Sequence, residues 1–120
     1  MKEILGTQYV LAVHDLKRSV SYYIEELGFE LFAEPPGWAF LKRESFIVML
    51  GECRGATDPK DLGVHSYFAY INDSNAKAIF NELSAKHVTI RKELKSESWG
   101  MKEFAIETID GHRIMFGEAL

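Results

Sequence analysis

The sequence has little of several features that mark particular classes of protein. Its 120 residues include one cysteine, Cys53, so no disulfide can form within the chain, which fits a reducing compartment. Lysine and arginine (14) are outnumbered by aspartate and glutamate (18), and no basic patch interleaved with aromatic residues indicates a nucleic-acid surface. No stretch approaches the roughly 20 apolar residues of a membrane helix, and the N-terminus lacks a signal-peptide pattern. We therefore expect a cytoplasmic globular protein with no nucleic-acid or membrane partner.

What the chain does have is an internal repeat. Met49-Leu50-Gly51-Glu52 closes an apolar run in the first half, and Met115-Phe116-Gly117-Glu118 closes another near the C-terminus. Upstream, Val13-His14-Asp15 and Ile71-Asn72-Asp73 open two helix-like segments with a constant offset of 58 residues between them. These pairs indicate one small unit used twice, with a cleft between its two copies.

Turn and capping residues divide each copy into the same elements. Asp15 is the predicted N-cap of the first helix and Asp73 or Ser74 that of the second, while Gly28 ends the first helix. Apolar and β-branched runs predict strands over 8–13, 29–33, 38–42, 45–50, 65–71, 88–94, 104–109 and 113–116. Each half therefore has the order βαβββ, and the fold class is α+β.

The domain organisation follows from the same pattern. Most of the small, polar and turn residues lie between Gly51 and Gly63, which makes this segment the best linker candidate. We expect a single domain over residues 1–120, made of module 1 (about 6–52) and module 2 (about 64–118) joined by this linker.

The chain resembles the vicinal oxygen chelate superfamily of glyoxalases, bleomycin-resistance proteins and dioxygenases. Val13 to Val20, followed by Leu27-Gly28-Phe29, is similar to the superfamily's opening strand and helix. Trp99 to Phe104 and then Asp110 to Phe116 are similar to the tail of the bleomycin-resistance branch, although the usual proline before the Asp-Gly turn is replaced by Ile109. The resemblance implies two βαβββ modules forming a half-open mixed β-barrel, and a homodimer.

The resemblance also assigns four positions at which superfamily enzymes hold a divalent metal. They fall on Gln8, Met49, Ser66 and Met115. Neutral thioethers do not replace carboxylates as ligands of a hard or borderline dication, and no anionic ligand remains to offset the cost of burying its charge. We therefore predict no metal, no cofactor and no catalytic residue.

Alternation along the strands predicts what lines the cleft. The residues that share the parity of the four positions include Val10 and Ala12. The predicted ligand-binding residues are Gln8, Trp38, Ile47, Met49, Ser66, Phe68, Tyr70, Trp99, Arg113 and Met115. Most are apolar or aromatic with few polar anchors, the profile of a small-molecule site. The two tryptophans, each beside a glycine, could instead be structural plugs.

These observations favour a binding protein over an enzyme. The first hypothesis is a metal-free protein that sequesters a small aromatic or amphipathic, drug- or antibiotic-like molecule. Because the predicted cleft offers Arg113 and few carboxylates, a neutral or anionic ligand fits it better than a cation. The alternative is a metal-dependent lyase or dioxygenase using Gln8, His65 and Glu52 or Glu118. A third hypothesis is a regulatory or interaction module with no dedicated ligand. We expect Glu52 and Glu118 at solvated strand ends, and His87 and His112 at the surface.

Overall fold

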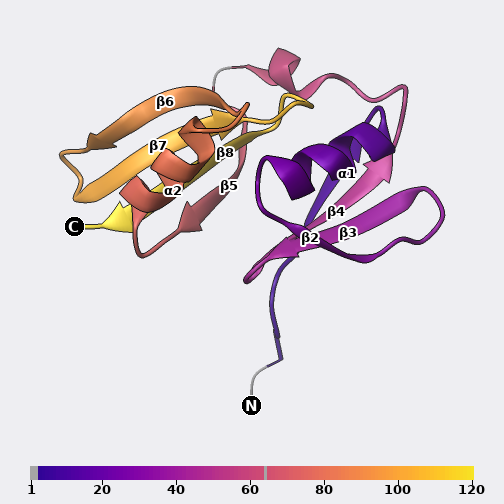
Figure 1. Cartoon of the computed structure of the whole chain (residues 1–120), viewed down its shortest axis with the longest axis horizontal. Helices are drawn as coiled ribbons and strands as arrows, with labels where there is room; N and C mark the ends of the chain where they lie inside the picture. Colours follow the sequence, from indigo (N-terminus) through magenta and orange to yellow (C-terminus); the bar gives the residue numbers. More distant parts are fainter. Residues whose placement is uncertain (1–2, 64) are drawn as a thin grey trace. The chain divides into compact units, whose positions relative to one another are not determined.

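The structure, a computed structural model, describes residues 3–63 and 65–120 and consists of two compact units, Met1–Ala56 and Thr57–Leu120. The first unit contains β1 (Tyr9–Val13), α1 (Leu16–Glu25), β2 (Glu30–Ala33), β3 (Trp38–Arg43) and β4 (Phe46–Glu52). The second begins with a 3-10 turn, η1 (Pro59–Leu62), and continues with β5 (Tyr67–Asn72), α2 (Ala76–Ser84), β6 (Thr89–Ser96), β7 (Met101–Glu107) and β8 (Arg113–Ala119). The predicted α+β class and the βαβββ order of both modules are confirmed (Figure 1).

Both units pair their strands in the same way. The sheet orders are β1-β4-β3-β2 and β5-β8-β7-β6, so the first strand of each unit lies beside the last. That pair is parallel and the others are antiparallel, which makes both sheets mixed. Val10 is the register partner of Met49, and Tyr70 that of Met115. The repeated methionines therefore occupy corresponding places in the two sheets.

Each helix covers one face of its own sheet, and the core of each unit lies between them (Figure 1). In the first unit Leu41, Val48 and Leu50 are fully buried. In the second, the Phe104 ring stacks on Phe116 with centroids 4.9 Å apart and meets Phe80 of α2 edge-on at 5.3 Å. We call the face of each sheet that is turned away from its helix the open face. Alternation places the other half of the strand residues there.

The helix caps confirm one prediction and correct another. Asp15 caps α1, because its Oδ1 accepts a hydrogen bond from the Arg18 amide at 3.1 Å. For α2 the predicted caps, Asp73 and Ser74, are wrong: Asn75 is the cap, and its side chain accepts from the Ala78 amide at 3.0 Å. The Asp73 amide is still bonded to the Gly117 carbonyl of β8, so the chain has not yet left the sheet there.

The glutamates that end the repeated motif also serve the helices. The Glu52 carboxylate accepts the Leu16 amide at the start of α1 at 3.0 Å, and the Glu118 carboxylate accepts the Ala76 amide at the start of α2 at 2.9 Å. A carboxylate is favourable at a helix N-terminus, where free amides carry partial positive charge. Both side chains therefore have a structural partner, which the prediction of solvated strand ends did not foresee.

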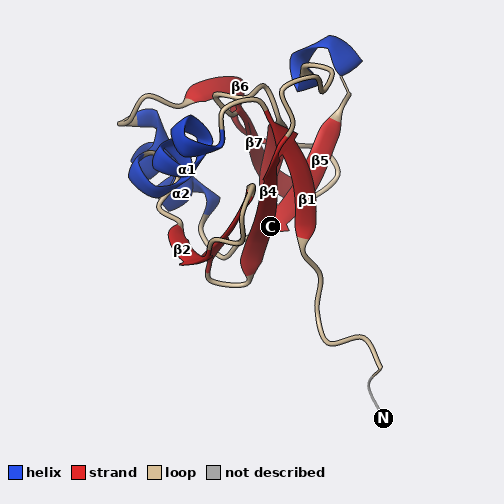
Figure 2. Ribbon diagram, turned by 90° about the vertical axis from the view of Figure 1, so that its right-hand side faces the viewer, coloured by secondary structure: helices blue, strands red, loops and turns tan. Residues whose placement is uncertain are grey.

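The chain termini add little to the two cores. Residues 3–8 are exposed and run away from the sheet to which β1 belongs (Figure 2). Within the part of the chain that the structure describes, neither helix is long and apolar enough to span a membrane.

Candidate functional site

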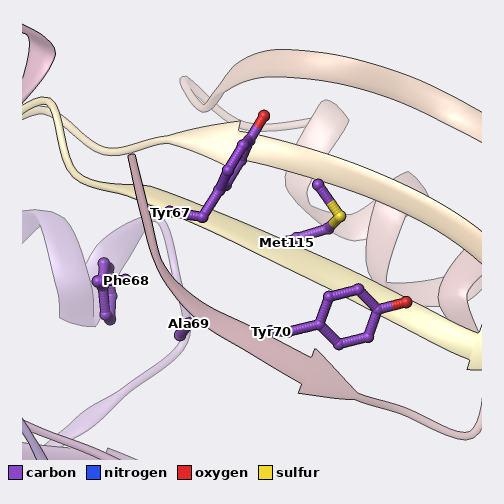
Figure 3. A pocket seen from close by; sticks show the side chains of 5 residues that line it. All are labelled: Tyr67, Phe68, Ala69, Tyr70 and Met115. Atoms are coloured by element: carbon purple, nitrogen blue, oxygen red, sulfur yellow. The ribbon is translucent and has the colours of Figure 1, made fainter. Parts of the chain in front are cut away.

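A pocket of about 270 Å³ opens on the sheet of the second unit between β5 and β8 (Figure 3). Tyr67 and Tyr70 of β5 project to the same side as Met115 of β8, and Phe68 and Ala69 complete the lining. Tyr70 and Met115 were predicted to share a face, and they do, because they are register partners. The lining is aromatic and apolar, with a polarisable thioether at its centre.

A bulge in β5 changes which residue stands beside Tyr70. The register between β5 and β8 shifts between Tyr67 and Ala69, so strict alternation fails there. Tyr67 therefore takes the place that alternation gave to Phe68. Phe68 still lines the pocket, but its ring points away from Met115 (Figure 3) and meets the ring of His112 edge-on at 5.9 Å.

Tyr70 lies across Gly117, the glycine of the repeated motif. A Cβ at position 117 would overlap the tyrosine hydroxyl and would stand 2.6 Å from Tyr70 Cζ. In the first unit the corresponding glycine, Gly51, is covered by Trp38, whose ring carbons would lie 2.9 Å from an added Cβ. In both units the repeated glycine, which has no side chain, therefore leaves room for an aromatic ring to lie against the strand on the open face.

Glu103 of β7 joins several polar and aromatic side chains of this face. Its carboxylate accepts hydrogen bonds from the Tyr70 hydroxyl at 2.5 Å, the Lys92 ammonium at 2.7 Å and the Trp99 indole N–H at 3.3 Å. The Lys92 ammonium also lies 5.5 Å from the centroid of the Trp99 ring. The side chain of Glu103 is only 5% exposed, so a buried carboxylate has one cation and two neutral donors. We call Tyr70, Lys92, Trp99 and Glu103 the Glu103 cluster.

The cluster shifts the ionisation of its members. Burial alone would raise the pKa of Glu103, but the hydrogen bonds from Lys92, Tyr70 and Trp99 outweigh it and hold that pKa below its usual range. Burial, the hydrogen bond to Glu103 and the negative charges of Glu103 and Asp73 together raise the pKa of Tyr70 well above its usual value. At neutral pH the phenol is therefore protonated and the carboxylate is ionised.

Sequence reasoning missed Tyr67, Lys92 and Glu103. For Glu103 a signal existed: it precedes Phe104, a buried core residue, and strand alternation then turns it to the open face. The signal was lost because β7 was expected to begin at Phe104, whereas it begins at Met101. For Lys92 the register of β6 against β7 shifts on both sides of it, so alternation gives no prediction.

A second, smaller pocket of about 190 Å³ adjoins the first and shares Tyr67 and Phe68 with it. Three predicted ligand-binding residues line it, Ser66, Phe68 and Arg113, and the two polar ones have partners within the protein. The Ser66 hydroxyl donates to the Leu62 carbonyl at 2.6 Å. Arg113, which is buried, donates through Nε to Glu107 at 3.3 Å and through its guanidinium to the Gly63 carbonyl. Neither side chain is a free anchor for a ligand.

The predicted ligand-binding residues of the first unit lie on the sheet of that unit, except for Gln8. Trp38 of β3 and Met49 of β4 are on the open face, where Trp38 meets Phe40 edge-on at 6.5 Å, and Ile47 follows the parity of Met49. Gln8 is the exception: it is exposed and precedes β1, in the segment that runs away from the sheet (Figure 2).

The side chains do not fit the divalent metal that superfamily enzymes hold. Across residues 3–63 and 65–120, no three His, Cys, Asp or Glu side chains come together as a ligand set. Met115 stands between tyrosines, and the carboxylates of Glu52 and Glu118 are bonded to helix amides. His65, the other alternative ligand, is exposed and lies before β5 begins. The thioethers are soft and neutral, and the Ser66 hydroxyl is also uncharged, so these positions offer a dication no negative charge.

His112 was expected at the surface, and this prediction is wrong. It is buried against Phe68, its Nδ1 has no hydrogen-bond partner among the described residues, and burial lowers its pKa despite the opposing charges of Asp110 and Asp58. The turn that carries it folds inward, because its backbone amide bonds to the Thr108 hydroxyl at 3.2 Å.

The lowered pKa of His112 predicts a loss of stability on mild acidification. The unfolded chain, with a histidine pKa of about 6.5, binds the proton before the folded chain does. The free energy of unfolding should therefore fall as the pH drops through that value and should continue to fall until folded His112 also protonates. Urea titrations between pH 8 and 5 should show a shallower dependence in His112→Gln. Equal slopes in the wild-type protein and His112→Gln would contradict this assignment.

Comparisons with known proteins agree on one family. The model of the glyoxalase/bleomycin resistance protein/dioxygenase superfamily matches residues 7–116. No match was found among curated proteins.

Similar solved structures include three from actinomycete sources. TnmS3, an antibiotic binding protein from Streptomyces sp. CB03234, has a TM-score of 0.79 at 19% identity over 100% of this chain and 99% of its own. The bleomycin-binding protein from bleomycin-producing Streptomyces verticillus, solved with copper(II)-bleomycin, has a TM-score of 0.74 at 20% identity over 97% of both chains. TioX from Micromonospora sp. ML1 has a TM-score of 0.73 at 21% identity over 96% of this chain and 100% of its own. At these identities the likeness shows the fold alone.

Proposed function

The chain belongs to the glyoxalase/bleomycin resistance protein/dioxygenase superfamily, and from this premise we propose that it is a non-enzymatic binding protein. It sequesters a small aromatic or amphipathic molecule of the drug or antibiotic kind, without a metal. The observation that carries the proposal is the pocket of Tyr67, Tyr70 and Met115, whose aromatic walls and thioether suit a flat apolar ligand.

Two further observations support binding rather than catalysis. The charged groups that border the two pockets are paired within the protein: Glu103 with Lys92, and Arg113 with Glu107. General acid–base work needs a group within reach of the substrate whose proton is available near the working pH, and a carboxylate that already accepts three hydrogen bonds is not such a group. Two of the similar structures are named for binding an antibiotic, which is in keeping with the proposal.

Filling the pocket should abolish binding. Isothermal calorimetry against a panel of planar aromatic compounds should give at least one saturable ligand for the wild-type protein. Met115→Trp replaces the thioether at the centre of the pocket with a larger ring, so the affinity for that ligand should drop at least about tenfold, or about 1.4 kcal/mol. Ile109→Trp makes a similar change at a site that is 46% exposed, in the turn between β7 and β8, and should leave the affinity unchanged.

Failure of the whole panel to bind the wild-type protein would argue against this function, and full affinity in Met115→Trp would move the site elsewhere. Stoichiometric metal in protein purified without chelator would overturn the metal-free part of the proposal. The homodimer stays a prediction, which the mass measured by sedimentation equilibrium checks.

A further inference from the structure

We propose that Glu103 is a positioning residue of this binding site, and that the pocket selects uncharged aromatic ligands over cationic ones because the charge of Glu103 is already compensated. Its carboxylate fixes the Tyr70 ring along β8 and the Trp99 indole beside it. The inference rests on the proposed binding function for its ligand preference, but not for the positioning of the two rings.

The contacts of Glu103 account for most of what a carboxylate can accept. One oxygen receives the Lys92 ammonium at 2.7 Å, and the other receives the Tyr70 hydroxyl at 2.5 Å and the Trp99 N–H at 3.3 Å. A carboxylate has about four lone-pair positions, so three are in use. With its side chain 5% exposed and a cation in direct contact, Glu103 presents little negative charge to a ligand.

Tyr70 needs two restraints to form the wall of the pocket. Gly117 leaves the space into which the ring lies, and Glu103 holds the hydroxyl at the far end. Tyr70 is 39% exposed, so its ring is not held by packing on every side. Holding it beforehand removes ordering cost from the binding step. Loss of either restraint should therefore lower the affinity, although neither residue needs to touch the ligand.

The hydrogen bond between Tyr70 and Glu103 also determines which hydrogen bonds Tyr70 can form with a ligand. Because the Tyr70 hydroxyl donates to Glu103, its oxygen can only accept a hydrogen bond from a ligand. The neighbouring cations are also compensated: Lys92 lies 3.8 Å from Glu97 as well as against Glu103, and Arg113 is paired with Glu107. A ligand cation would therefore lose its hydration without contacting a carboxylate, because none of the residues that line the pocket carries one and Glu103 is compensated, whereas a neutral hydroxyl-bearing ring loses little.

Three naphthalene compounds of equal ring size separate these effects. They are naphthalene-2-methanol (neutral), 2-naphthylmethylammonium (cation) and 2-naphthoate (anion), each titrated into the wild-type protein by calorimetry. We expect the neutral compound to bind at least about tenfold more tightly than the cation, which is about 1.4 kcal/mol. Equal or tighter binding of the cation would overturn the ligand preference.

Glu103→Gln tests the positioning role with the side-chain size retained. The amide leaves the Lys92 ammonium with only the more distant Glu97, 3.8 Å away, as a charge partner, so the ratio of anion to neutral affinity should rise. Because Tyr70 and Trp99 lose a charged acceptor, the affinity for the neutral compound should fall at least fivefold. The ¹³Cζ signal of Tyr70, assigned by its loss in Tyr70→Phe, should titrate at a lower pH than in the wild-type protein, because a neighbouring negative charge and a hydrogen-bond acceptor are gone. The Trp99 indole N–H should exchange faster with solvent. Unchanged titration and exchange in a folded variant would overturn the positioning role.

Gly117→Ala perturbs the Glu103 cluster from a different residue, and it is the test to use if Glu103→Gln does not fold. The added methyl group must displace Tyr70, so Tyr70 should again titrate at a lower pH than in the wild-type protein, and the neutral compound should again bind more weakly. Gly55→Ala, whose Cβ meets nothing within 4 Å, is the matched control and should behave as wild type. If no compound binds the wild-type protein, the binding function and the ligand preference fail together, while the signals of Tyr70 and Trp99 still decide on the positioning role.

Discussion

Phe104→Ala should destabilise the second unit by about 3–5 kcal/mol, the range measured for large aromatic residues deleted from a packed core. Phe104 is fully buried, stacks on Phe116 with an angle of 8° between the rings, and meets Phe80 of α2 edge-on. It therefore joins β7, β8 and the helix. Alanine would leave a cavity that the two remaining rings cannot both close, because one is fixed in a strand and the other on a helix.

Urea denaturation followed by circular dichroism measures this loss. Phe32→Ala is the control, since Phe32 is 46% exposed on the open face of the first unit and should cost less than about 1 kcal/mol. A loss below about 1 kcal/mol for Phe104→Ala would mean that the stack does not hold the second unit together. Because the neighbouring residue on β7 is Glu103, we also expect the variant to loosen the Glu103 cluster before the unit unfolds.

The fold was predictable because local signals and the internal repeat agreed. The carboxylate of Asp15 predicted the start of α1, and the Asp110-Gly111 turn between two apolar runs predicted the hairpin of β7 and β8. Where the two copies differ in length, the repeat gave a wrong prediction of the helix cap. The second copy has a longer connection between β5 and α2 than the first has between β1 and α1, so the cap fell on Asn75 rather than Asp73 or Ser74.

The candidate site was predictable only where a strand is regular. Alternation correctly placed Tyr70 beside Met115, because the two strands are in register at that point. One extra residue in β5 turned Tyr67 rather than Phe68 toward Met115, and a bulge leaves no mark in a sequence without a glycine at that position. Ser66 and Arg113 each donate to a backbone carbonyl of the segment before β5, whose path no periodicity describes.

The repeated motif carries more information than the duplication it first indicated. In each copy the methionine is on the open face and the next residue is in the core. The glycine leaves room for an aromatic ring, and the glutamate accepts a hydrogen bond from the first amide of the helix of its own unit. A carboxylate is thus present in the motif but is directed to the opposite face from the methionine. Sequence position alone could not exclude Glu52 and Glu118 as metal ligands, whereas their hydrogen bonds to Leu16 and Ala76 give them another role.

Arg113→Met should cost about 2–3 kcal/mol of stability, because it removes one member of a mostly buried ion pair; fully buried pairs lose about 3–5 kcal/mol on such truncation. The arginine side chain is 5% exposed and its partner Glu107 is 24% exposed, so solvent compensates the remaining carboxylate in part. The Gly63 carbonyl also loses its guanidinium donor. Denaturant unfolding measures the loss, and Arg113→Lys should recover the charge but not the two-sided hydrogen bonding, giving an intermediate value.

This substitution also separates two roles for Arg113. If Arg113 were a ligand anchor, its loss would weaken binding of 2-naphthoate selectively and leave the free energy of unfolding nearly unchanged. As the structural link between β7, β8 and the segment before β5, its loss should lower stability while the ratio of 2-naphthoate to naphthalene-2-methanol affinity stays within about twofold, or about 0.4 kcal/mol. Glu107→Gln provides the other half of a double-mutant cycle, in which a coupling energy above about 1 kcal/mol would identify the ion pair as the origin of the loss. The internal partners of the guanidinium make the structural outcome the expected one.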